Sequence, residues 1–381
     1  MVAPTTSERP DTPMGRALAQ RVLSHIGPAR ATTSGLIDLT TAEPAPTPGH
    51  IGQIAKTALD EGETHYTDAS GIPPLRAAIA RHLATLGFAI QPENIGVSNG
   101  GTEAVYIALQ VALQPGERAA VIEPMSQHIV DMVTFIGAEP VRVTVEPSNG
   151  LLPDPAAIER LDARALVIAS PSPITGKRAP DERLEALVAA ARAKDISVIL
   201  DLSYAAGLYE PSPIQFSSPH LAEEIVLTGS FSTAHGLAGW RVGYFSSPAA
   251  DRVLLQGLKT AMSICTTAVS QFAAVAALGQ PDGWFEERRA HFADNRASVT
   301  ALLDEAGIAY IQPDAFPPLL IDVSAFGGGD AVAARLADDG VIVDPGSSFG
   351  TSTRDYIRIN LGAPAETLEV GVRRIVELSG D

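Results

Sequence analysis

Cysteine, positive charge and long apolar runs are scarce in this sequence, and each shortage excludes a class of protein. The 381 residues contain one cysteine, Cys265, so neither an internal disulfide nor a cysteine-rich metal cluster is available. No apolar run approaches the roughly 20 residues that cross a bilayer. The first residues also lack the apolar stretch of a secretory signal, which predicts a cytoplasmic location.

Positive charge is outnumbered, with 27 Lys and Arg against 44 Asp and Glu and a formal net charge of −17. Such a chain repels nucleic acid and anionic membranes, and no basic stripe reverses the repulsion locally. The composition is 45% hydrophobic with 33 Gly and 29 Pro, which is typical of a globular protein. These features predict a small-molecule partner, with no nucleic acid and no membrane.

Short, continuous apolar runs alternate with helical stretches through the middle of the chain. Runs of this kind are typical of strands buried on both faces, and they occupy residues 119–122, 165–169, 197–200 and 225–228. Helical stripes precede such runs, for example Leu184, Leu187, Val188 and Ala191. The pattern predicts an α/β fold with a mostly parallel sheet covered by helices.

Near residue 280 the pattern of predicted elements changes. From there a long charged helix is followed by a strand, a helix, a strand and a final helix. We therefore predict a large domain over residues 49–279 and a small α+β domain over residues 280–381. Residues 1–48 are predicted to form an N-terminal arm and part of the small domain, because a Pro-rich segment ends this region.

Residues 97–109, VSNGGTEAVYIAL, form the first candidate site. A strand is predicted to end at Ser98 and a helix to begin at Thr102, after Gly100 and Gly101. Free backbone N–H groups and the helix dipole then face whatever lies over the glycines, and a phosphate fits such a place. A tight turn without a ligand is the alternative.

Asp201 lies at the end of an apolar strand, where open α/β sheets bind ligands. A carboxylate there needs a cationic or hydrogen-bonding partner, and a helix cap or a loop salt bridge is the alternative. Tyr204 either belongs to the core or presents its hydroxyl to the same ligand.

Residues 230–244, SFSTAHGLAGWRVGY, combine the hydroxyls of Ser230, Ser232 and Thr233 with Arg241 at the start of a strand. Hydroxyls and a guanidinium at a strand end suit a phosphate, although a surface loop with one paired arginine also fits. Arg358 lies in the apolar segment YIRIN, where a buried guanidinium must meet an anion.

Together these blocks resemble class I/II aminotransferases, the fold type I enzymes that use pyridoxal phosphate (PLP). The resemblance covers nearly the whole chain through YTDASGIPPLR, SNGGTEA, SPSPITG, ILDLSYA, SFSTAHGLAGWRVGY, PGSSFG and YIRIN, in that order. It implies a large domain with a mostly parallel sheet and a smaller α+β domain. It also implies PLP or its amine form, pyridoxamine phosphate (PMP), as cofactor and an amino acid or 2-oxo acid as substrate.

The resemblance also assigns roles to residues. The cofactor phosphate is assigned to Gly100, Gly101, Thr102, Ser230, Ser232 and Arg241. Asp201 is expected to keep the pyridine nitrogen protonated, and Tyr204 to bond the ring hydroxyl. Arg358 is expected to bind the substrate α-carboxylate, with Ala42 as a further substrate residue. Tyr66 is expected to reach the phosphate of a neighbouring subunit, which implies a homodimer.

Three departures from the family pattern lie around the cofactor ring. Pro173 stands where an asparagine donates to the ring oxygen, and Ser126 stands where an aromatic stacks on the ring, although His128 nearby offers a ring. Above all, Thr233 stands where the family has the lysine that anchors the cofactor covalently and moves the substrate proton. A hydroxyl forms no imine and is a poor base, so the loss costs about 10²–10⁴ in rate.

Replacement bases are few, because the chain has only four lysines: Lys56, Lys177, Lys194 and Lys259. Lys177 follows the loop expected to border the cofactor, with a surface position as its alternative. His235 is a candidate base two residues after Thr233, with structural packing as its alternative.

Three functional interpretations stay open. The first is an aminotransferase-like enzyme that binds PLP or PMP without a covalent anchor, for an altered reaction in specialised biosynthesis. The second is a non-catalytic or PLP-independent relative that binds an amino acid or a partner. The third is an ordinary aminotransferase with an engineered lysine-to-threonine change, against which Ser126 and Pro173 argue.

Overall fold

The computed structural model of the chain describes residues 36–40, 42, 49–145, 152–248, 251–279 and 282–378. All of these except Leu36 belong to one compact unit, Ile37–Asp381. Most of the predicted N-terminal arm, residues 1–35, 41 and 43–48, lies outside the described residues.

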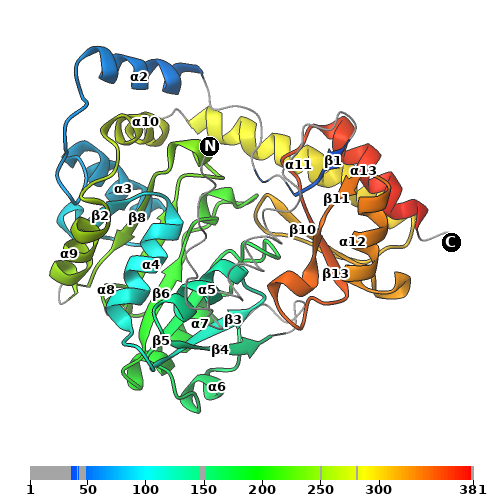
Figure 1. Cartoon of the computed structure of the whole chain (residues 1–381), viewed down its shortest axis with the longest axis horizontal. Coiled ribbons are helices and arrows are strands. Elements are labelled where there is room, and N and C mark those ends of the chain that lie inside the picture. The colour runs from blue at the N-terminus through cyan, green and yellow to red at the C-terminus, as the bar shows by residue number, and fades with distance from the viewer. Residues whose placement is uncertain are drawn as a thin grey trace, which may run out of the picture. The chain divides into compact units, whose positions relative to one another are not determined.

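A seven-stranded sheet forms the centre of the described chain, in the order β2-β8-β7-β6-β5-β3-β4 (Figure 1). Strand β8 pairs antiparallel with β2 and β7, and the other pairs are parallel. The strands are β2 Ile95–Ser98, β3 Arg118–Glu123, β4 Glu139–Thr144, β5 Ala165–Ala169, β6 Ser197–Asp201, β7 Val226–Ser230 and β8 Gly243–Ser246. The predicted α/β class and mostly parallel sheet are confirmed.

Both faces of this sheet are covered, which explains the continuous apolar runs. Within β3, for example, Ala120 and Ile122 belong to one apolar cluster, whereas Ala119 and Val121 belong to the other. Successive strand residues point to opposite faces, so a sheet covered on both sides needs apolar residues at every position.

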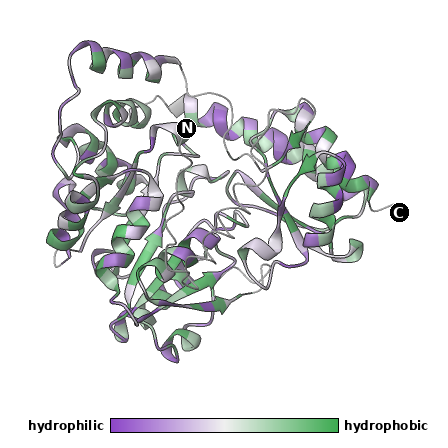
Figure 2. Cartoon of the chain, viewed as in Figure 1, coloured by the Kyte–Doolittle hydropathy of each residue, from purple (hydrophilic) through white to green (hydrophobic). Residues whose placement is uncertain are grey.

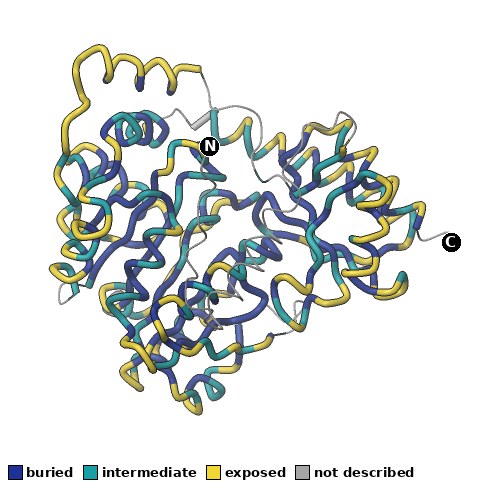
Figure 3. Tube along the Cα trace, in the orientation of Figure 1, coloured by how far each residue is buried: buried dark blue, intermediate teal, exposed yellow. Residues whose placement is uncertain are grey.

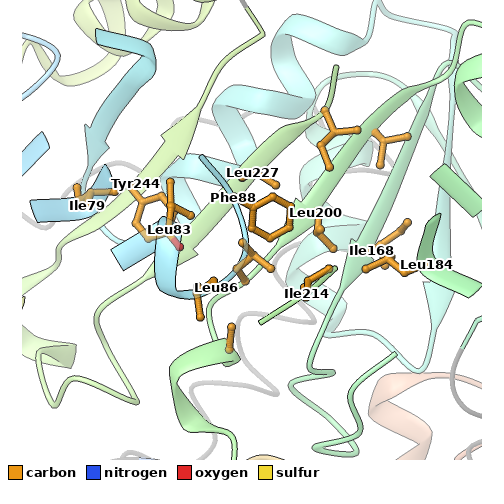
Figure 4. Packing of buried hydrophobic residues seen from close by; sticks show 14 of the residues in the cluster. Ile79, Leu83, Leu86, Phe88, Ile168, Leu184, Leu200, Ile214, Leu227 and Tyr244 are labelled. Carbon is orange, nitrogen blue, oxygen red and sulfur yellow. The ribbon is translucent and has the colours of Figure 1, made fainter. Parts of the chain in front are cut away.

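Helices supply the two covering layers. Their bounds are α2 Gly49–Asp60, α3 Pro73–Thr85, α4 Gly101–Ala112, α5 Gln127–Phe135, α6 Pro155–Glu159, α7 Asp181–Ala193, α8 Pro219–Glu223, α9 Arg252–Ser263 and α10 Ala268–Leu278. The predicted stripe of α7 is buried. Figure 4 shows Leu184 of α7 beside Ile168 of β5, and Leu83 of α3 beside Tyr244 of β8. Helix α2 is mainly exposed (Figure 3).

The C-terminal part contains a four-stranded sheet in the order β12-β13-β10-β9 and a two-stranded pair of β1 with β11. The strands are β1 Ile37–Asp38, β9 Tyr310–Ile311, β10 Pro318–Asp322, β11 Val341–Ile342, β12 Asp344–Pro345 and β13 Tyr356–Asn360. The helices are α11 Asp282–Glu305, α12 Gly329–Asp338 and α13 Ala365–Glu377. As Figure 2 shows, hydrophobic residues concentrate on β10 and β13.

Strand β1 joins the N-terminal side of the chain to this C-terminal part, because Ile37 and Asp38 pair in parallel with Val341 and Ile342. That pairing agrees with the expectation that residues before 49 contribute to the small domain. The domain division at residues 49 and 280 stays a prediction. In the described ranges, every helix is either too short or too polar to span a membrane.

Candidate active site

A cavity of about 190 Å³ opens at the carboxyl ends of the parallel strands and at the start of α4. This space greatly exceeds the roughly 10–15 Å³ that one water requires. Eleven of the predicted site residues line it: Gly101, Thr102, Ser126, His128, Pro173, Asp201, Tyr204, Ser230, Ser232, Thr233 and Arg241. Segments separated by more than 100 residues in sequence thus meet around one space.

The glycines at the start of α4 keep one end of the cavity open. Gly100 has φ +84°, and a Cβ there would meet the guanidinium of Arg241. A Cβ on Gly101 would lie 3.0 Å from Cβ of Ser230 and 3.1 Å from Oγ of Ser203. No side chain caps α4, so its first N–H groups remain for an anion.

Arg241 brings positive charge to the same end. Its Nη1 donates to Oγ of Ser232 at 3.4 Å and to the Ala238 carbonyl at 3.1 Å, and Nη2 donates to the Asn99 carbonyl at 3.5 Å. The Ser230 hydroxyl donates to Oγ of Ser232 at 2.8 Å. A helix start, two hydroxyls and a guanidinium form a site that fits a phosphate.

A buried ion pair supports this helix start from behind. Glu103 accepts the Asn99 N–H at 2.5 Å and Nζ of Lys259 at 2.9 Å. Burial raises the pKa of Glu103, but the bonds from Asn99, Lys259 and Ser263 together lower it below its ordinary value. Lys259 therefore neutralises a carboxylate that would otherwise repel an anion at the helix start.

Asp201 lies at the end of β6 with only one carboxylate oxygen in use. Its Oδ1 accepts the Ser203 N–H at 3.0 Å, the Ser203 hydroxyl at 2.6 Å and the Thr228 hydroxyl at 3.5 Å. Oδ2 has no hydrogen-bond partner among the described residues. Burial raises the pKa of Asp201 despite the opposing bonds. A cationic N–H donor in the cavity would therefore complete the site.

Thr233 lies beside Tyr204 on the cavity wall. Burial raises the pKa of the Tyr204 phenol, while the positive charge of Arg358 and a hydrogen bond with the Thr233 side chain act in the opposite direction. Thr233 thus shares the cavity with the tyrosine that was expected to bond the cofactor.

No lysine is among the residues that line this cavity. All four lysines of the chain lie in the described ranges, and each has a partner elsewhere: Lys56 with Asp60, Lys177 with Asp314, Lys194 with the carbonyls of Glu159 and Leu161, and Lys259 with Glu103. The Nζ of Lys177 lies 2.7 Å from Oδ1 of Asp314. The structure therefore gives Lys177 no place as the replacement amine.

His235 does not line the cavity that contains Thr233; it lines a separate one together with His82. Its ring is buried and packs edge-on against Phe231, Phe285 and His82, with centroids 4.9, 5.0 and 5.2 Å away. Burial lowers the pKa of His235 well below its usual value. This geometry favours the packing alternative, and the role of His235 as a catalytic base stays a prediction.

The three departures around the ring position share the cavity. Ser126 immediately precedes α5, and His128 lies in the first turn of that helix. Pro173 supplies no N–H, and its carbonyl oxygen accepts Nη1 of Arg358 at 3.3 Å. Val105, Ile129 and Val167 add apolar walls.

Arg358 lies next to the cavity without lining it, and it already has an anionic partner. Both Nε and Nη2 donate to Oδ2 of Asp344, at 3.1 and 2.7 Å. The prediction that this guanidinium meets an anion is confirmed, but the anion belongs to the protein. Neither Ala42, which is partly buried, nor Tyr66, which is exposed, lines the cavity.

Two residues of this region, Ser203 and Asp344, were not predicted from the sequence. Ser203, which orients Asp201, was visible as a hydroxyl two residues after that carboxylate, where side chains often accept or donate locally. Asp344 precedes the PGSSFG block, and its pairing with Arg358 depends on strand register, for which no local signal exists.

One cavity at the edge of a mostly parallel sheet brings together the uncapped N-terminus of α4, Arg241 and the strand-end Asp201. This arrangement is that of an enzyme of the fold type I PLP class. The family model described as "Aminotransferase class I and II" matches residues 35–375. The chain belongs to the class I and II aminotransferase family. Enzymes of this family use PLP and PMP, and the cavity residues fit that cofactor.

Relatives match along most of their length. The chain is 31% identical over 358 residues to an aspartate/prephenate aminotransferase of Thermus thermophilus, covering 91% of each chain. It is 33% identical over 337 residues to the arginine–pyruvate transaminase AruH of Pseudomonas aeruginosa, covering 86% of each. The solved structure of Thermus thermophilus aspartate aminotransferase with maleate aligns with a TM-score of 0.85 at 28% identity, covering 97% of both chains.

Proposed function

We propose that this protein is a lysine-less member of its family that binds PLP or PMP without a covalent anchor. It acts on an amino acid or the corresponding 2-oxo acid, in an altered reaction suited to specialised biosynthesis. One observation carries the proposal: the cavity that joins Asp201 to Arg241 presents Thr233 and no lysine.

The cavity residues have distinct tasks in this proposal. The N–H groups at Gly101 and Thr102 hold the phosphate together with Ser230 and Arg241. Oδ2 of Asp201, which has no hydrogen-bond partner among the described residues, would accept a hydrogen bond from the protonated pyridine N–H, and that positive charge would offset the cost of burying the carboxylate. When bound, the cofactor supplies an electron sink for the bond broken at the substrate α-carbon.

Thr233 determines what is unusual about this site. Its hydroxyl lies on the same cavity wall as Tyr204, but it moves a proton poorly near neutral pH. Losing a positioned base lowers the rate of proton transfer by about 10²–10⁴. We therefore propose that proton movement at the α-carbon relies on the substrate or on water.

A non-catalytic relative is the second candidate, and the pairing of Arg358 with Asp344 favours it. An engineered change at residue 233 alone does not account for Ser126 and Pro173. The homodimer and the cytoplasmic location remain part of the proposal. The exposed Tyr66 supports the former, because an exposed aromatic is free to reach the cavity of a second copy.

Titration of the purified protein with PLP tests the main proposal. A shifted absorbance band that saturates and is lost on dialysis is expected for non-covalent binding. Borohydride reduction followed by mass analysis should leave the protein mass unchanged. The absence of a saturable absorbance change would favour the second candidate. An increase in protein mass equal to that of the cofactor would show a covalent bond and reject the unanchored site.

A further inference from the structure

A second cavity lies apart from the one that contains Thr233. Its volume is about 440 Å³, within the range of roughly 300–1,000 Å³ that ligand pockets occupy. Its walls come from α3, from residues 205–212 after β6, from the end of α10 and from the first turns of α11. The two cavities have no lining residue in common among those that the structure describes. They are therefore separate sites.

Two arginines give the second cavity a positive rim. Arg81 of α3 is exposed, and its side chain has no hydrogen-bond or ion-pair partner among the described residues. Nε of Arg289 donates to the Leu208 carbonyl at 2.9 Å, and its terminal N–H groups have no partner in the described ranges. Glu286 is the one acidic residue among the described lining residues, and it pairs with neither arginine. In a chain of net charge −17, this rim attracts an anion.

Apolar side chains form most of the wall behind this rim. They belong to Leu86, Leu208, Leu278 and Phe285, with alanines between them. Walls of this kind favour a ligand with a hydrophobic body, because the body and the wall both lose contact with water. The cavity therefore suits a molecule that has one charged end and an apolar remainder.

His235 lies at the buried end of the cavity, with an exposed fraction of 1% and with His82 as its neighbour. Neither ring nitrogen of His235 has a hydrogen-bond partner within the described part of the chain. Burial lowers the pKa of His235 well below its usual value, so the ring is neutral and has one donor and one acceptor. A buried polar group without a partner is costly, and a ligand hydroxyl that bonds to it would offset this cost.

We infer that the second cavity binds an organic carboxylate with an apolar body of about the size of a phenyl ring and a hydroxyl group at its far end. The carboxylate lies at Arg81 and Arg289, the body lies against the apolar walls, and the hydroxyl lies at His235. This site goes beyond the proposed function and does not depend on it, because its residues lie outside the cavity of Thr233.

Calorimetric titration of the full-length protein, with and without saturating PLP, tests this site. The probes are 3-(4-hydroxyphenyl)propionate, 3-phenylpropionate, 3-phenylpropanamide and acetate. We expect 3-phenylpropionate to bind at least about tenfold more tightly than the amide, which lacks the charge, and than acetate, which lacks the apolar body. The hydroxylated acid should bind about fivefold more tightly again, as one added hydrogen bond predicts.

Arg81→Gln tests the rim, because it removes one positive charge from a side chain that has no partner to lose. Affinity for both aromatic acids should fall about fivefold, whereas Arg81→Lys, which keeps the charge, should stay closer to wild type. Binding of the amide should change in neither variant. Arg160→Gln removes the same charge from an exposed position after α6 and should leave every affinity unchanged.

His235→Phe tests the buried end. It keeps an aromatic ring in the cluster and removes two nitrogens that have no partner, so the midpoint of thermal unfolding should not fall. The fivefold preference for the hydroxylated acid should disappear, while the affinity for 3-phenylpropionate should stay as in wild type.

Each outcome bears on one part of the inference. If neither aromatic acid binds saturably, or if the acid and the amide bind equally, the site is overturned. Unchanged affinities in Arg81→Gln would place the acid elsewhere on the protein and overturn the assignment to this cavity. A hydroxyl preference that persists in His235→Phe overturns the role of that residue. Failure of PLP to bind contradicts the proposed function alone, because the acids are titrated without PLP as well.

Discussion

At one end of the cavity the first N–H groups of α4 have no side-chain cap and lie close to Arg241. At the other end Arg358 is bonded to Asp344 and to the Pro173 carbonyl. Both ends contain an arginine, but Arg358 is paired with a carboxylate of the protein, whereas the printed bonds of Arg241 to described residues go to one hydroxyl and two carbonyls. The difference teaches that a matching residue type does not establish a binding site until its partners are known.

The largest effect on this comparison should come from Gly100→Ala. The new Cβ would displace the guanidinium of Arg241, and φ +84° strains any L-residue. PLP affinity should fall about 100-fold, because charge-assisted bonds to the phosphate are lost. Absorbance titration measures this loss.

Gly116→Ala is the matched control for Gly100→Ala, since Gly116 has φ +86° with nothing within 4 Å of a built Cβ. Both variants should lose about 1–3 kcal/mol of stability from backbone strain. Only Gly100→Ala should weaken PLP binding. Equal PLP affinities in the two variants would contradict a phosphate site at the start of α4.

A second test separates stability from cofactor binding at Asp201. Asp201→Asn should lower PLP affinity about 30-fold, because a charged hydrogen bond to the pyridine nitrogen contributes about 1.5–3 kcal/mol. The same variant should unfold at higher denaturant concentration than wild type without cofactor, since burial disfavours the charged carboxylate.

The pH dependence of this gain follows from the raised pKa of Asp201 in the folded protein. Above about pH 3.9 the unfolded chain releases the proton first, so this carboxyl group makes stability fall as pH rises through the folded-state pKa. The stability gain of Asp201→Asn should therefore grow with pH across that window. Asp322→Asn, another strand-end aspartate that accepts the N–H two residues on, is the control. A gain that shrinks with rising pH contradicts the assignment.

The smallest effect is expected from Ser203→Ala, which removes the 2.6 Å bond to Oδ1 of Asp201 and leaves the carboxylate in place. PLP affinity should fall about fivefold, the equivalent of roughly 1 kcal/mol for one hydrogen bond. Ser347→Ala removes a bond of the same length to Asp330 far from the cavity and serves as control. A loss as large as that of Asp201→Asn would show that Ser203 contacts the cofactor directly.

Much of the fold could be predicted because the physical cause of each element is local. The runs that became β3, β5, β6 and β7 are mostly apolar on both faces of the strand, as two covered faces require. The strand-end position of Asp201 and the glycines before α4 were also readable, because parallel strands end at one edge of the sheet.

The remaining features depend on contacts between distant segments. The pairing of Asp344 with Arg358 is set by an antiparallel register that a shift of one residue would reverse. His235 lies two residues from Thr233, yet the turn closed by the bond from the Gly236 N–H to the Thr233 carbonyl sends its ring into an aromatic cluster. The short distance between His235 and Thr233 in the sequence therefore did not indicate that their side chains line different cavities.

The occupied state of every lysine has a practical consequence for chemistry in this cavity. An aldehyde placed there meets no lysine amine of the chain, since each Nζ is engaged elsewhere. A lysine introduced at position 233 would thus act without a competitor. Comparing that variant with the chain that has Thr233 isolates what tethering a cofactor contributes on one scaffold.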